Sequence, residues 1–229
     1  MNWLTDLLDV YGRVLRRAVD LTLKHWWLGL IAIAYLAAFG GLAIVAMPLG
    51  IIGGFLLGFG MAALLSSWLV LVDQVVRNGR VTLAEIPGSF VVYLFDVITF
   101  LFVRSLLSWA ASSAFGEDSY AGIVADLALF VFLNAAPEQI YLARNSGLAV
   151  FVESYRFIGT YWIEWPPINV LLAVLFRAVV EYVAAIGVGV ALVLAAIVLT
   201  FGFIARGLLF LQLTTSSRRA REFARRTAG

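Results

Sequence analysis

Two long apolar runs, residues 26–72 and 166–213, limit the possible folds of this chain more than any other feature. Each run is more than twice as long as the roughly 20 residues that cross a bilayer as one helix. Each run therefore predicts a hairpin of two spans. Because Pro and Gly interrupt helices, we place the first turn at the Met-Pro-Leu-Gly sequence of residues 47–50. We place the second near the Gly-Val-Gly sequence of residues 187–189.

The composition agrees with a membrane protein. Of 229 residues, 63% are hydrophobic and 13% are charged, whereas soluble domains are about half apolar and about a quarter charged. Between the two hairpins the sequence predicts two further spans, residues 89–111 and 121–136, which are joined by a polar loop at 112–121. The predicted fold is an all-α, polytopic membrane protein with six transmembrane helices in one domain, residues 26–213.

The placement of basic residues predicts an orientation. Of the 16 Lys and Arg residues, only Arg104, Arg177 and Arg206 fall inside predicted spans. If both termini are cytoplasmic, the remaining bases all lie on the cytoplasmic side, which is the bias seen in membrane proteins. Because all but one of the bases are Arg, we favour a GC-rich bacterial source. The sequence therefore predicts a multi-pass protein of the bacterial inner membrane.

Three segments outside the spans are amphipathic. Residues 1–25 have apolar side chains at helical spacing, which is typical of a helix that lies in the membrane interface. A helix packed on the rest of the protein would show the same pattern, and both interpretations stay open. Residues 138–165 mix charges with Trp and Tyr and predict a cytoplasmic surface element. We expect the charges of this element to remain in water while five aromatic rings enter the interface: Tyr155, Phe157, Tyr161, Trp162 and Trp165.

The basic tail, residues 214–229, fits either contact with anionic headgroups or a simple role in topology. Two shorter patterns predict local structure. Thr82 and Glu85 have the spacing of a capping box, which predicts a helix start. Residues 145–147, Asn-Ser-Gly, predict a turn.

Six charged residues fall within predicted spans: Asp96, Arg104, Asp126, Arg177, Glu181 and Arg206. A lone charge at the bilayer centre costs at least ~2.5–3.5 kcal/mol, so we expect each to have a partner. Matching depth suggests Arg104 with Asp126, and it places Asp96 and Arg206 toward the cytoplasmic ends of their spans. Arg177 and Glu181, four residues apart, share a helix face. These charges form either a polar pathway or a set of structural ion pairs.

A stripe of small residues recurs every four positions in the second span: Gly50, Gly54, Gly58, Ala62 and Ser66. Small-xxx-small spacing lets another helix approach closely. The partner is either a helix of the same chain or a second copy of the protein in a homo-oligomer.

Several kinds of chemistry have no support in the sequence. The chain has no cysteine and one histidine, His25, which we interpret as an interfacial anchor beside two tryptophans. No nucleotide-binding loop is present. We therefore predict no catalytic residue, metal site, cofactor or nucleic-acid partner. Two functions remain: a small transporter or channel that uses the intramembrane charges, or a non-enzymatic scaffold or accessory subunit that binds lipids or partner proteins.

Overall fold

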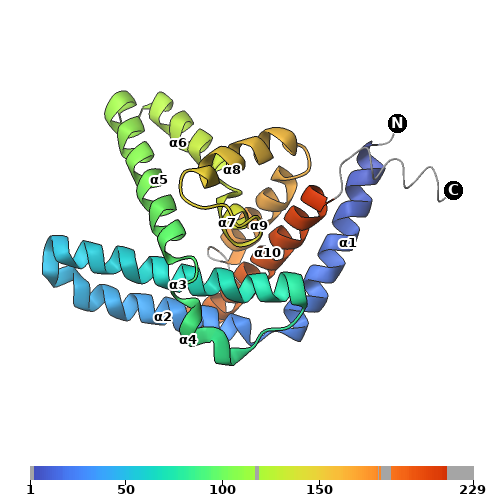
Figure 1. Ribbon diagram of the computed structural model, residues 1–229, viewed down its shortest axis with the longest axis horizontal. Helices are drawn as coiled ribbons and strands as arrows, with labels where there is room; N and C mark the ends of the chain where they lie inside the picture. The colour runs from blue at the N-terminus through green and yellow to red at the C-terminus, as the bar shows by residue number, and fades with distance from the viewer. Residues whose placement is uncertain (1–2, 117–118, 180, 182–186, 216–229) are drawn as a thin grey trace. The chain divides into compact units, whose positions relative to one another are not determined.

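The computed structural model describes residues 3–116, 119–179, 181 and 187–215, and every regular element in these ranges is a helix (Figure 1). Four helical runs are long and apolar enough to cross a membrane, namely Leu28–Asn78, Leu94–Phe115, Tyr120–Tyr141 and Gly189–Thr215. The predicted all-helical class is confirmed, and the apolar helices agree with a membrane protein. The six-span count stays a prediction.

The first run folds back on itself, as the sequence predicted. Helix α2 (Leu28–Ala46) ends at a 3₁₀ turn, η1 (Met47–Leu49), and helix α3 (Gly50–Asn78) follows. Gly50 has a φ of +55°, a left-handed conformation that a residue without Cβ adopts at little cost. As one straight helix the run would measure about 76 Å, far more than the roughly 30 Å of a hydrocarbon core. The turn at residues 47–50 is confirmed.

The described chain forms two compact units, and each is presented by itself. Unit 2 consists of Ala34–Gln74 and Arg80–Trp162. Besides most of α2 and α3 it contains η2 (Leu83–Glu85), α4 (Ile86–Ser89), α5 (Leu94–Phe115), α6 (Tyr120–Phe132), α7 (Ala136–Tyr141) and α8 (Ala149–Thr160).

Helices α5 and α6 are neighbours, as expected from the short loop between them. The predicted bounds were only approximate. Helix α5 begins at Leu94 rather than at residue 89, and it continues to Phe115 rather than ending at 111. Ser112 and Ser113, which were predicted to lie in the loop, therefore belong to the last turn of the helix.

The predicted capping box does not form. A helical turn does begin after Thr82, but the Thr82 side chain makes no capping hydrogen bond. The Glu85 carboxylate instead accepts a hydrogen bond from the Gln74 side chain, and the backbone N–H of Thr82 lies 3.4 Å from the Gln74 oxygen. The side-chain amide of Gln74 thus bonds both groups, the Thr82 N–H and the Glu85 carboxylate, that the capping box would have joined.

Unit 1 consists of Met1–Ile33, Val75–Gly79 and Ile163–Gly229. Its helices are α1 (Trp3–Lys24), α9 (Pro166–Ala178) and α10 (Val188–Thr215), and α1 lies along α10 (Figure 1). Helix α9 has 13 residues, or about 20 Å, which is short for a span. Helix α10 begins at the predicted turn, but residues 182–186 before it lie outside the described residues.

The apolar face of α1 is buried in protein. Val10, Val14, Ala18 and Leu21 are at most 9% exposed, and α10 is the helix that packs along α1. Of the two interpretations of residues 1–25, the structure therefore shows the packed helix. Contact of its remaining surface with a membrane stays a prediction.

Residues 138–165 differ from the expected surface element in two respects. Glu138 and Glu164 are buried, so the prediction that the charges of this segment remain in water is wrong for these two residues. Trp165 is also buried and cannot serve as an interfacial anchor, whereas Trp162 is 66% exposed. The predicted turn is confirmed, with Gly147 at a φ of +57°. Placement of this segment on a membrane surface stays a prediction.

Tyr11 joins α1 to the start of α9 within unit 1. Its hydroxyl donates to the Glu164 carbonyl oxygen at 2.6 Å and accepts from the Ile168 N–H at 3.1 Å. Because prolines fill the first two positions of α9, Ile168 carries the first N–H of that helix, which has no partner inside the helix. The Tyr11 side chain therefore caps α9 from another part of the chain.

We expect Tyr11→Phe to lower the free energy of unfolding by about 1–2 kcal/mol, because it leaves the Ile168 N–H without an acceptor. Burial raises the pKa of the Tyr11 hydroxyl, which lies outside the candidate spans, from 10.0 to about 12. The folded state therefore keeps this proton longer than the unfolded state, and the stabilisation is lost as pH rises from 10 through 12. The difference in stability between wild type and Tyr11→Phe, measured in detergent from pH 8 to 12, should shrink above pH 10. A constant difference would contradict the assignment.

Candidate functional site

The predicted intramembrane charges have separate local surroundings. Asp96, near the start of α5, is half-buried and accepts a hydrogen bond from the Gly147 N–H at 3.2 Å. Its partner is therefore a backbone group of a turn. Such a bond stabilises a carboxylate without requiring a second charge.

The predicted pair of Arg104 with Asp126 is wrong. Asp126 Oδ1 accepts from Ser108 Oγ at 2.8 Å, and within the described residues no hydrogen bond or ion pair joins Asp126 to Arg104. The two helices are neighbours as expected, but Asp126 meets α5 one helical turn farther along than predicted. The sequence therefore predicts the position of a residue along its helix only to within about one turn.

The remaining three intramembrane charges, Arg177, Glu181 and Arg206, lie in unit 1. The shared face of Arg177 and Glu181 is confirmed, since Arg177 Nε donates to Glu181 Oε1 at 2.7 Å. The Arg206 guanidinium carbon lies 5.3 Å from the centre of the Trp165 ring, a distance that suits a cation–π contact. In each case the neighbouring group comes from the same unit.

A cluster of hydrogen-bonded hydroxyl groups lies in the interior of unit 2. Ser67 Oγ is 2.6 Å from the Tyr35 hydroxyl and 2.5 Å from Ser89 Oγ. Ser66 Oγ donates to the Ser89 carbonyl at 3.1 Å and accepts from the Tyr93 N–H at 2.9 Å. Ser66, Ser67 and Ser89 are at most 2% exposed. These bonds tie α2, α3 and the turn before α5 together in a region with little water.

Arg144 extends this cluster with a charge pair. Its guanidinium donates to Asp73 Oδ2 at 2.7 Å and also to the Tyr93 hydroxyl. Arg144 has a φ of +60°, a left-handed conformation that costs a non-glycine residue about 1–2 kcal/mol. Asn145 N–H bonds back to the Gln139 carbonyl at 2.9 Å and closes the end of α7. The hydrogen bonds of the side chain offset the strain of the backbone.

Sequence reasoning missed this polar cluster as a unit. Asp73 follows directly after the first apolar run, and Arg144 is one of the bases predicted to lie on the cytoplasmic side. Ser66 was singled out for its small size and not for its hydroxyl. The available signal was a pair of adjacent serines, Ser66 and Ser67, inside an otherwise apolar helix, where buried hydroxyls need partners.

The stripe of small residues does not form one packing face. A Cβ on Gly54 or Gly58 would meet nothing within 4 Å, whereas Ala62 and Ser66 are fully buried. Positions four apart drift by about 40° per step on a straight helix, so the stripe turns through about 160° between its ends. Tight packing within the chain is therefore wrong for Gly54 and Gly58.

Two other glycines of α3 make the close approach to α2. A Cβ on Gly53 would lie 1.8 Å from the Ala46 carbonyl oxygen, and one on Gly60 would lie 2.2 Å from a Leu42 methyl group. We expect Gly53→Ala to lower the melting temperature in detergent, because a backbone atom cannot move aside easily and overpacking costs about 1–3 kcal/mol. The adjacent Gly54→Ala is the matched control and should be neutral or stabilising by up to about 1 kcal/mol. Equal effects of the two substitutions would contradict this packing.

Two of the hollows on the described surface bear on function. One, of about 710 Å³, is an apolar groove between α3 and α5 that Gly54 and Gly58 help to line. The other, of about 410 Å³, lies on the charged side of α1. Neither hollow is lined by any of the six intramembrane charges, so neither provides a polar pathway through them.

The single histidine, His25, lies against the backbone at the end of α3. His25 is buried and its Nε2 lies 3.1 Å from the Gly79 carbonyl oxygen, where a protonated Nε2 donates to the end of α3. The position of this histidine at a membrane interface stays a prediction. Among the residues that the structure describes, no group of three His, Asp or Glu side chains could hold a metal ion.

Comparison with known proteins adds no assignment. No protein-family model, curated protein or solved structure matches this chain. The function is therefore inferred from the geometry of the described residues.

Proposed function

We propose that the protein is a non-enzymatic membrane scaffold or accessory subunit. The observation that supports this function is the separation of the intramembrane charges, since Asp96 and Asp126 each have a local partner and neither lines the α3–α5 groove or the hollow on α1. Charges used for conduction are expected to face a water-filled cavity. Local hydrogen bonds instead fix how helices pack.

The proposal includes the location that the sequence predicted. The protein lies in the bacterial inner membrane with both termini in the cytoplasm, and it spans the bilayer six times. A homo-oligomer is part of this proposal because the groove at Gly54 and Gly58 is apolar and open, and small residues at its floor would allow a second helix to approach.

Single-cysteine labelling in proteoliposomes tests the scaffold against the transporter, and the chain has no cysteine to remove. Ser108→Cys places a thiol beside Asp126, about 10 Å from the end of α5. A membrane-impermeant maleimide should label it far more slowly than Asn78→Cys and Ser119→Cys, which mark opposite sides of the membrane. Fast labelling of Ser108→Cys would reveal a water-filled path and favour transport. Labelling of Asn78→Cys and Ser119→Cys from the same side would contradict the span count.

A further inference from the structure

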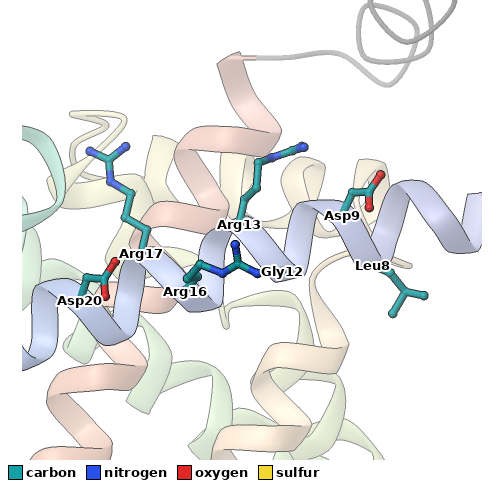
Figure 2. Close-up of a pocket in the computed structure, with 7 residues that line it drawn as sticks. All are labelled: Leu8, Asp9, Gly12, Arg13, Arg16, Arg17 and Asp20. Carbon is teal, nitrogen blue, oxygen red and sulfur yellow. The ribbon is translucent and has the colours of Figure 1, made fainter. Parts of the chain in front are cut away.

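The outer surface of α1 combines two kinds of exposed side chain. Outside the face that packs on α10, Arg13, Arg16 and Arg17 are exposed. Within the described residues no hydrogen bond or ion pair engages these three guanidinium groups. Figure 2 shows Arg13 and Arg17 extended to the same side of the helix, and Leu8 extended to the other.

An apolar strip lies beside these arginines. Leu8, Val19 and Leu23 are 66%, 45% and 68% exposed. At about 100° per residue they fall within about 60° of one another around the helix, with Arg16 next to them. Trp26, just beyond the helix end, is exposed as well. These side chains are not part of the core of unit 1. Helix α1 therefore has two apolar surfaces, one packed on α10 and one exposed.

A hollow separates the basic and apolar side chains. It is lined by Leu8, Asp9, Gly12, Arg13, Arg16, Arg17 and Asp20. Gly12 forms its floor, and a Cβ there would meet nothing within 4 Å. A ligand in this hollow would meet an alkyl side chain on one edge and guanidinium groups on the other. The aspartates at its two ends, Asp9 and Asp20, disfavour an anion that extends along the whole helix and restrict it to the middle.

We propose that this surface, the α1 arginine face, binds the phosphate groups of anionic phospholipids while Leu8, Val19 and Leu23 enter the outer part of the acyl region. Guanidinium groups bind phosphate in bidentate fashion, and apolar side chains beside a basic row are typical of helices at a membrane surface. Each arginine near an anionic membrane strengthens attachment about fivefold. The proposal depends on the proposed function only in placing the protein in a membrane.

Lipid-selective quenching tests this proposal on the full chain in bilayers. A fluorophore is attached to Val19→Cys, outside the hollow, and quenching by spin-labelled phosphatidylglycerol is compared with quenching by spin-labelled phosphatidylcholine. We expect phosphatidylglycerol to be preferred at least about fivefold at low salt, with the preference falling as salt rises. Replacing Arg13, Arg16 and Arg17 together by Gln should bring the preference close to one.

Two controls make the outcome decisive. The matched triple Lys variant keeps the charge and should keep most of the preference, and Arg156→Gln, at an exposed arginine paired with Glu153 in unit 2, should change nothing. Equal quenching by the two lipids in the wild type, or a preference that survives the triple Gln variant, would overturn the proposal. A fluorophore quenched by neither lipid would also overturn it and would point to an acidic protein partner. Failure of the scaffold proposal can be told apart from these outcomes, because it would show as fast maleimide labelling of Ser108→Cys.

Discussion

Replacing Trp165 by Ala should lower the free energy of unfolding by about 3–5 kcal/mol, the largest effect of any single substitution considered for this protein. Trp165 is 1% exposed and meets Phe210 edge to face, with ring centres 6.4 Å apart. The substitution removes an indole from between α10 and the start of α9. It also takes away the ring that lies beside Arg206.

The measurement is denaturant or thermal unfolding in detergent, followed by circular dichroism. Trp162→Ala is the matched control, because this tryptophan is three residues away and 66% exposed. Its removal should change stability by less than about 1 kcal/mol. Comparable losses for the two variants would show that Trp165 is not part of a packed core.

Breaking the bond between Arg144 and Asp73 should have the second largest effect. Arg144→Gln and Asp73→Asn should each cost about 1.5–3 kcal/mol, the range for hydrogen bonds to charged groups. We choose this range over the larger cost of a fully buried pair because the Arg144 side chain is 54% exposed. The double variant should cost less than the sum by about 1 kcal/mol, since the two residues are in contact.

Glu153 and Arg156 supply the matched control cycle. They form an exposed pair at 2.6 Å, three residues apart on α8, and such pairs couple by no more than about 0.5 kcal/mol. If the Arg144 and Asp73 effects were additive, the polar cluster of unit 2 would not depend on their bond. Both cycles use unfolding in the same detergent, so that lipid effects cancel.

The elements that sequence predicted well are those that local chemistry determines. The turn at residues 47–50 contains Pro48 and needs the positive φ of Gly50, and no other part of the run has this combination. The pair of Arg177 and Glu181 follows from helix geometry alone. Each of these predictions depends on residues within one or two turns of each other.

The predictions that failed required the rotation of one helix relative to another. Asp126 was placed on the correct pair of helices, but it bonds to Ser108 rather than Arg104. Gly54 and Gly58 were expected to let another helix approach closely, whereas Gly53 and Gly60 make the close approach to α2. A shift of one residue rotates a side chain by about 100°, and hydrophobicity does not distinguish these positions in a helix that is apolar all round. The polar cluster around Arg144 was missed for the same reason.

The packing of α1 against α10 has a consequence for biosynthesis. The two helices are separated by most of the chain, yet Val14 and Ala18 are covered in the finished protein. At about 5–20 residues per second, the roughly 190 residues between Leu21 and Leu213 take about 10–40 s to synthesise. During that interval the apolar face of α1 lacks its final partner, and the nearby bilayer surface is the place where it can remain without aggregating. If α1 has the membrane affinity that its amphipathic sequence predicts, we expect the nascent helix to rest on the bilayer surface until the completed fold covers this face.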